Sequence, residues 1–127
     1  MRRNLFALAL LALGLSAPVA AGTVAKPVSW QHGGTTFDGY LVYDADEDDV
    51  RPGLLMVPNW MGVTESAIEK AKALADDDYV ILLVDMYGRG VRPADTNEAG
   101  AAAGAVYADR DVLRGRINAA LEVLRGI

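Results

Sequence analysis

Two short turns hold the residues whose types suit them for chemistry. Asn59-Trp60-Met61-Gly62 follows one short apolar run, residues 53–57, and the second turn, residues 85–90, follows another, residues 79–84. Short apolar runs bounded by Gly or Pro predict strands that are buried on both faces. Ligands of open α/β sheets bind in the turns where such strands end. The two turns therefore predict a ligand site at one edge of a sheet.

Two side chains of these turns are candidates for substrate binding. Arg89 carries a guanidinium, which can bind a carboxylate in a cleft through two parallel hydrogen bonds. A salt bridge or a helix contact on the surface is the alternative role for Arg89. Asn59 can line the pocket, or it can hydrogen-bond within its own turn, as Asn often does.

The surrounding pattern predicts the elements that position these turns. Residues 28–32 and 36–43 are rich in β-branched and aromatic residues and flank His32-Gly33-Gly34-Thr35, which predicts a hairpin. A helix capped by Thr64 or Ser66 joins the two apolar runs, and this order predicts a right-handed βαβ unit with a parallel sheet. The predicted fold class is therefore α/β.

Two further helices are expected toward the C-terminal end. The first covers residues 97–107, with Thr96 as its cap, and the second begins at about residue 109. The second has apolar residues at helical spacing that should face the core: Leu113, Ile117, Ala120, Leu121 and Leu124. The helix that joins the two apolar runs ends at Asp76, Asp77 and Asp78, for which the sequence indicates no functional role.

The N-terminal residues have the pattern of an export signal. Arg2 and Arg3 precede the apolar run 5–15, and Val19-Ala20-Ala21 has small residues where a signal peptidase cleaves. We expect a signal peptide over residues 1–21, a domain over residues 22–127, and a periplasmic or secreted protein. A membrane anchor is the alternative, but the run is shorter than the ~20 residues that a span needs. After cleavage, no stable membrane association is expected.

The composition of the chain limits the partners and cofactors that it is expected to bind. The chain has 127 residues, a net charge of −5 and no cysteine, so nucleic acid is not an expected partner and disulfides are excluded. Asp44, Asp46 and Asp48 match the first ligand positions of a calcium-binding EF-hand loop. The match fails where Gly and Glu are required, at Asp49 and Leu55, which favours a solvated loop. No cofactor and no metal site are predicted.

The two turns together resemble the dienelactone hydrolase family of the α/β-hydrolase superfamily. The resemblance rests on residues 57–63 and above all on Asp85-Met86-Tyr87-Gly88-Arg89-Gly90, and it covers the N-terminal half of the family fold. It implies a hydrolase of carboxylic esters or lactones with a Ser or Cys nucleophile, an acid and a histidine. It also implies that the Trp60 backbone N–H forms part of an oxyanion hole, and that Arg89 binds a substrate carboxylate.

The chain departs from the family pattern in two respects. Asn59 stands where the family usually has a glutamate, so a carboxylate cannot pair with the resting nucleophile there. There is also no G-x-S-x-G or G-x-C-x-G elbow, and the family order places the nucleophile, acid and histidine after residue 127. His32 is expected to be a solvated turn residue, and Ser66 lacks the glycines of a nucleophile elbow.

We therefore expect a partial α/β-hydrolase fold, with an N-terminal hairpin, a βαβ unit and two further helices. The complete protein should act on a small ester or lactone, whereas this chain alone should be inactive. The alternative is a small, secreted, non-catalytic α/β module that binds a ligand or partner at the Asn59 and Arg89 edge.

Overall fold

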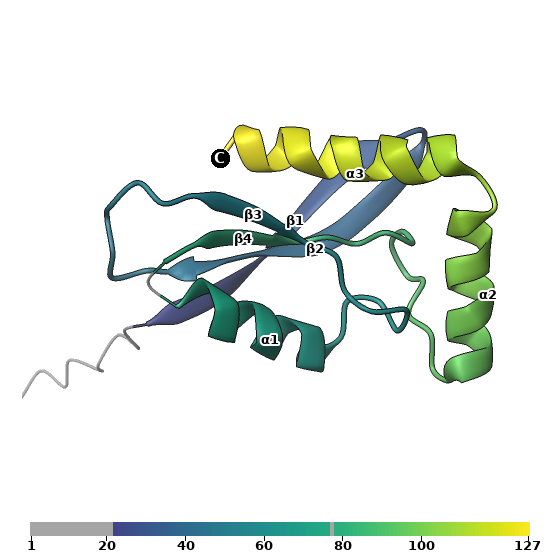
Figure 1. Ribbon diagram of the computed structural model, residues 1–127, viewed down its shortest axis with the longest axis horizontal. Coiled ribbons are helices and arrows are strands. Elements are labelled where there is room, and N and C mark those ends of the chain that lie inside the picture. The colour runs from purple at the N-terminus through teal and green to yellow at the C-terminus, as the bar shows by residue number, and fades with distance from the viewer. Residues whose placement is uncertain (1–21, 77) are drawn as a thin grey trace, which may run out of the picture.

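The computed structural model describes residues 22–76 and 78–127. The predicted signal peptide, residues 1–21, and Asp77 lie outside this part. Within it, a four-stranded mixed sheet is covered by helices on both faces (Figure 1). This confirms the predicted α/β class.

The N-terminal half of the sheet is the predicted hairpin. Strands β1 (Thr23–His32) and β2 (Thr35–Asp44) pair antiparallel along their whole length. Gly33 and Gly34 connect them with φ angles of 56° and 76°. Two successive positive φ angles belong to a type I′ turn, whose twist matches that of the strands it joins, and glycine adopts them without steric cost.

The predicted βαβ unit follows. Strand β3 (Gly53–Met56), helix α1 (Glu65–Ala75) and strand β4 (Val80–Leu83) bring β3 and β4 together in parallel. Of the two predicted caps, Thr64 is the one used, and its side chain accepts a hydrogen bond from the Ala67 N–H. Because β2 pairs antiparallel with β4, the strand order is β1-β2-β4-β3.

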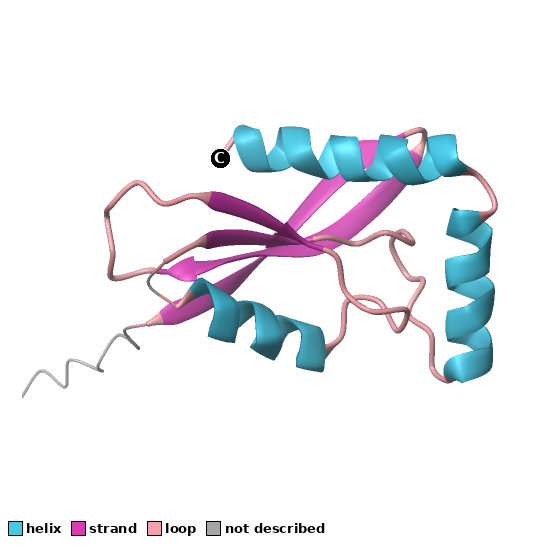
Figure 2. Cartoon of the chain, viewed as in Figure 1, coloured by secondary structure: helices cyan, strands magenta, loops and turns pink. Residues whose placement is uncertain are grey.

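The two predicted C-terminal helices are α2 (Thr96–Tyr107) and α3 (Arg110–Arg125). Asp95 caps α2 in place of the predicted Thr96, because its side chain accepts a hydrogen bond from the Glu98 N–H. Helices α1 and α3 cover opposite faces of the sheet, and α2 lies beyond the ends of β3 and β4 (Figure 2). The turns that follow these strands therefore lie between the sheet and α2.

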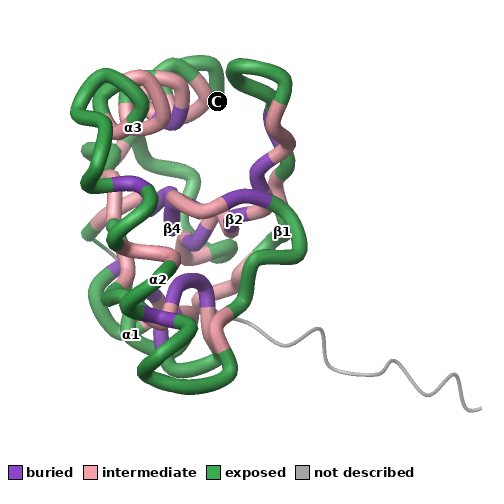
Figure 3. Tube along the Cα trace, turned by 90° about the vertical axis from the view of Figure 1, so that its right-hand side faces the viewer, coloured by how far each residue is buried: buried purple, intermediate pink, exposed green. Residues whose placement is uncertain are grey.

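Strand β4 is the centre of the core. Leu82 and Val84 pack with Phe37 and with Ala120 of α3, whereas Ile81 packs on the other face with Val42 and with the alanines of α1. The tube view places this buried stretch inside the molecule (Figure 3). The predicted burial of this strand on both faces is confirmed.

Gly39 of β2 allows the close packing beside β4. A Cβ atom at this position would clash with the Leu83 carbonyl oxygen and crowd the Trp30 ring. The glycine thus keeps β2 close to β4 just before the second turn begins.

The prediction of burial on both faces is wrong for strand β3. Leu54 is 39% exposed and the following Val57 is 52% exposed, whereas the apolar run predicted burial. Strand β3 lies at the edge of the described sheet, with β4 as its only neighbour there, so its outer side is left accessible.

Helices long and apolar enough to cross a membrane do not occur in the described residues.

Candidate functional site

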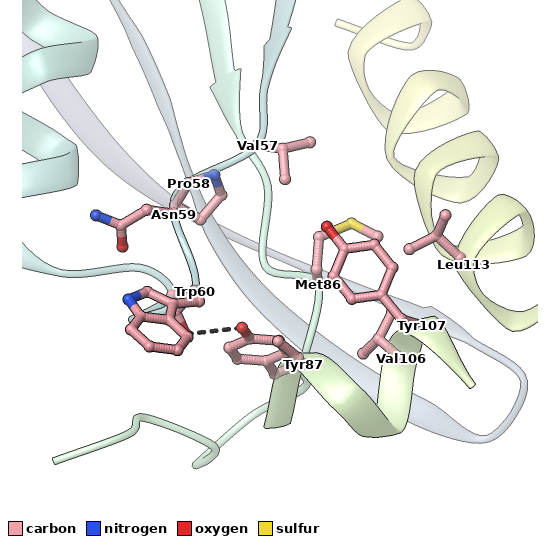
Figure 4. A pocket seen from close by; sticks show the side chains of 11 residues that line it. Val57, Pro58, Asn59, Trp60, Met86, Tyr87, Val106, Tyr107 and Leu113 are labelled. Carbon is pink, nitrogen blue, oxygen red and sulfur yellow. Dashed lines mark hydrogen bonds between the residues drawn. The ribbon is translucent and has the colours of Figure 1, made fainter. Parts of the chain in front are cut away.

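The two turns lie side by side at the carboxyl edge of β3 and β4. The Tyr87 hydroxyl of the second turn donates a hydrogen bond of 2.7 Å to the Trp60 carbonyl oxygen of the first (Figure 4). Burial raises the pKa of Tyr87, and nearby Tyr107 raises it further. The predicted convergence of the two turns is therefore present.

The first turn is organised by Asn59. Its side-chain oxygen accepts a hydrogen bond of 3.0 Å from the Met61 N–H, and its carbonyl oxygen accepts one of 2.9 Å from the Gly62 N–H. This is an Asx-type turn, in which a side chain replaces a backbone acceptor. The Asn59 and Trp60 N–H groups have no acceptor among the described residues, so they are the backbone donors of this turn that a ligand could use.

The second turn is organised by Asp85, which is 2% exposed. One carboxylate oxygen accepts hydrogen bonds of 3.0 Å from the Tyr87 and Gly88 N–H groups, and the other accepts one of 3.0 Å from the Asp38 N–H. Arg92 lies 3.4 Å from the same carboxylate. Asp85 therefore fixes the loop to strand β2 and is not positioned as a free acid.

Arg89 is directed toward strands β1 and β2. Its guanidinium donates two hydrogen bonds, of 2.6 and 2.9 Å, to the Asp38 carboxylate, and a third of 3.3 Å to the Ser29 hydroxyl. The hydrogen bonds from Arg89 and Ser29 hold the pKa of Asp38 well below its usual range, and Asp38 in turn raises the pKa of Arg89. The bidentate pair is the salt bridge that was the alternative role for Arg89.

This ion pair predicts an acid dependence of stability. The depressed pKa of Asp38 means that its contribution is present above the unfolded-state pKa of about 4 and is lost as the pH falls below it. Urea unfolding of Asp38→Asn should therefore show a smaller loss of midpoint between pH 6 and pH 3 than the unmodified chain. Asp48→Asn, in the exposed loop after β2, is the matched control. An equal acid effect in Asp38→Asn and the unmodified chain would contradict the assignment.

A pocket of about 170 Å³ opens beside the Trp60 turn. Its wall combines the first turn with Met86 and Tyr87 and with the end of α2 and the start of α3 (Figure 4). The lining residues are Val57, Pro58, Asn59, Trp60, Gly62, Met86, Tyr87, Ala103, Val106, Tyr107 and Leu113. The structure thus brings Asn59 and Trp60 to one pocket, whereas Arg89 is not part of its wall.

Several residues of the site escaped sequence reasoning. Tyr107 is the last residue of a weakly amphipathic helix, and Asp38 lies within a strand, so neither carries a local motif. The sequence did contain a signal for Asp85, because this residue opens the second turn directly after a buried strand.

His32 is exposed and lies against Gly115 of α3, at the hairpin end of β1. No group of three or more potential metal ligands occurs in the described part of the chain.

Comparison with known proteins identifies relatives of this arrangement. The model of the dienelactone hydrolase family matches residues 37–126. The dienelactone hydrolase-like promiscuous phosphotriesterase P91, from metagenomic libraries, has 30% sequence identity and a TM-score of 0.74 over 82% of this chain and 43% of its own. A protein named m3DLH has 26% identity and a TM-score of 0.76 over 84% of this chain and 44% of its own. The chain thus spans less than half the length of either protein. No curated protein matches it.

Proposed function

Because the chain belongs to the dienelactone hydrolase family, we propose that it forms the N-terminal part of a hydrolase of carboxylic esters or lactones. In this proposal, the pocket beside Trp60 receives part of the substrate. Residues outside this chain supply the nucleophile, the acid and the histidine.

The observation that carries the proposal is the Trp60 N–H. It is a backbone donor at the end of a parallel strand, it belongs to a residue of the pocket wall, and it has no acceptor among the described residues. Such a donor needs no reorganisation when negative charge develops on a tetrahedral oxygen. The hydrogen bonds that hold Asn59, Tyr87 and the Trp60 carbonyl oxygen support the same role, since they fix the turn on both sides of this N–H.

Binding of a substrate carboxylate by Arg89 is the less favoured part of the proposal. As a binder of a substrate carboxylate, Arg89 could offer only Nη1, because Nε and Nη2 already donate to Asp38 and Ser29. The paired arginine therefore favours a structural role over substrate binding.

The test is ester hydrolysis by two proteins. The 127-residue chain should not hydrolyse p-nitrophenyl acetate above the buffer rate, whereas the protein encoded by the continuous reading frame past the Ile127 codon should do so. Treatment with reagents for serine and cysteine nucleophiles should abolish the activity of the longer protein. Hydrolysis by the 127-residue chain that these reagents abolish would show that the nucleophile lies within it and would contradict the proposal.

The alternative, a non-catalytic binding module, makes a different prediction. It predicts a reading frame that stops at Ile127 and a chain that melts cooperatively as a monomer or homodimer. If the chain is instead part of the proposed hydrolase, the 127-residue chain on its own has β3 as an edge strand with exposed apolar residues, a feature that promotes association between chains.

A further inference from the structure

The pocket beside Trp60 has an uncharged wall. None of its eleven lining residues, all within the described part of the chain, is Asp, Glu, Lys or Arg. Three of them are the aromatic residues Trp60, Tyr87 and Tyr107, and most of the others are aliphatic. The Asn59 side-chain oxygen and the Tyr87 hydroxyl already hydrogen-bond within the two turns. The wall therefore offers aromatic and aliphatic contacts and neutral donors such as the Trp60 N–H, but no charged side chain.

The arginines near the second turn are all directed to groups of the protein itself. Arg89 binds the Asp38 carboxylate. Arg92 donates to the carbonyl oxygens of Asp38 and Val91 at 3.0 and 2.9 Å. Arg116 of α3 donates to the Met86 carbonyl oxygen at 2.7 Å and lies over the Phe37 ring. None of the three lines the pocket, so a carboxylate there would lack a cationic partner from this part of the chain.

The pocket has the size of one ring. An engineered apolar cavity of about 150 Å³ binds benzene, so a cavity of about 170 Å³ accommodates a phenyl ring or a branched alkyl group of similar volume. Tyr107 and Met86 lie on one side of this space, and Trp60 and Tyr87 lie on another (Figure 4). Aromatic side chains in this arrangement can contact a ring by offset stacking or edge to face.

We infer that this pocket binds an uncharged, ring-sized apolar group of the substrate and discriminates against a carboxylate at that position. The inference rests on the proposed function, because it names the substrate class of the same site. Its physical basis is the cost of transferring a carboxylate from water into an apolar pocket without a cationic partner. Burial of a neutral ring against the same wall is favourable.

The experiment compares methyl benzoate with benzoate as ligands of the 127-residue chain. Each is titrated while the two tryptophan indole N–H signals are followed by NMR. Trp60 lines the pocket, and Trp30 lies in the core at 8% exposure, so it serves as an internal reference. Methyl benzoate should shift the Trp60 signal and leave that of Trp30 nearly unchanged. Benzoate should bind at least about tenfold more weakly.

Two exposed residues give a matched pair of variants. Tyr107→Ala removes part of the wall from a side chain that is 72% exposed, and it should weaken methyl benzoate binding about fivefold. Leu74→Ala, at a position on α1 that is 55% exposed and outside the pocket, should leave binding unchanged. Folding of both variants is checked by far-ultraviolet circular dichroism.

Three outcomes would overturn the inference. The first is that benzoate binds as tightly as methyl benzoate and loses its binding in Arg89→Gln. The second is that neither ligand shifts the Trp60 signal. The third is that Tyr107→Ala binds methyl benzoate as well as Leu74→Ala does. Because binding is measured without turnover, its result is independent of the ester assay. Selective binding of the neutral ligand without hydrolysis by the longer protein would contradict the proposed function alone.

Discussion

Replacing Asp85 with alanine is expected to destabilise the fold by about 3–5 kcal/mol, because three backbone N–H groups lose their shared acceptor. The carboxylate is 2% exposed, so solvent does not readily take its place. A domain of this size has a total stability of about 5–15 kcal/mol. The melting temperature should therefore fall by on the order of 15 °C, measured by thermal and urea unfolding.

Two variants serve as comparisons for Asp85→Ala. Asp85→Asn keeps the shape and one oxygen acceptor, so the Tyr87 and Gly88 N–H groups can remain bonded and the loss should be smaller. Asp109→Ala removes an exposed carboxylate that also accepts two backbone hydrogen bonds, at the start of α3, and should cost about 1 kcal/mol. If Asp85→Ala cost no more than Asp109→Ala, the role of Asp85 as the organiser of the second turn would be refuted.

The largest expected effect on activity concerns the Trp60 backbone. In the complete hydrolase that we propose, Trp60→Pro removes the N–H and should lower kcat by about 10²–10³, the usual loss when one oxyanion-hole donor is deleted. The reason is that the donor acts on charge that develops only in the transition state, so KM should change much less. Steady-state hydrolysis of p-nitrophenyl acetate measures both constants.

Trp60→Ala is the matched control, since it removes the indole but keeps the N–H. Its effect should fall mainly on KM, because the indole forms part of the pocket wall. Thermal melts of both variants check that the turn still folds, since proline also restricts the conformation of Asn59 before it. Equal losses of kcat in Trp60→Pro and Trp60→Ala would rule out the N–H as the active donor.

The motif of the second turn predicted where Arg89 lies in the fold but not which residue it contacts. The two turns together resemble the family, and the resemblance assigns Arg89 to a substrate carboxylate. The fold brings Asp38 of β2, which lies 51 residues earlier, into bidentate contact with Arg89. A guanidinium whose Nε and Nη2 already bind one carboxylate has only Nη1 left for a second, and its charge is already compensated.

The exposure of β3 has a similar origin. An apolar run of this length predicts burial on both faces from local composition alone, and β4 fulfils that prediction. The open side of β3 depends on which strands are its neighbours. That property belongs to the sheet as a whole, so Leu54 and Val57 carry no local sign of it.

The sequence by itself determined the hairpin at Gly33-Gly34, the βαβ unit and the position of both turns at the carboxyl edge of the sheet. These features depend on glycine conformation, apolar periodicity and capping, which act between residues close in the chain. Only the tertiary structure decided that Arg89 pairs with Asp38, that Asp85 binds β2, and that Tyr107 reaches the Trp60 pocket. These contacts join residues 47 to 51 positions apart, and they form only when helices and strands pack together.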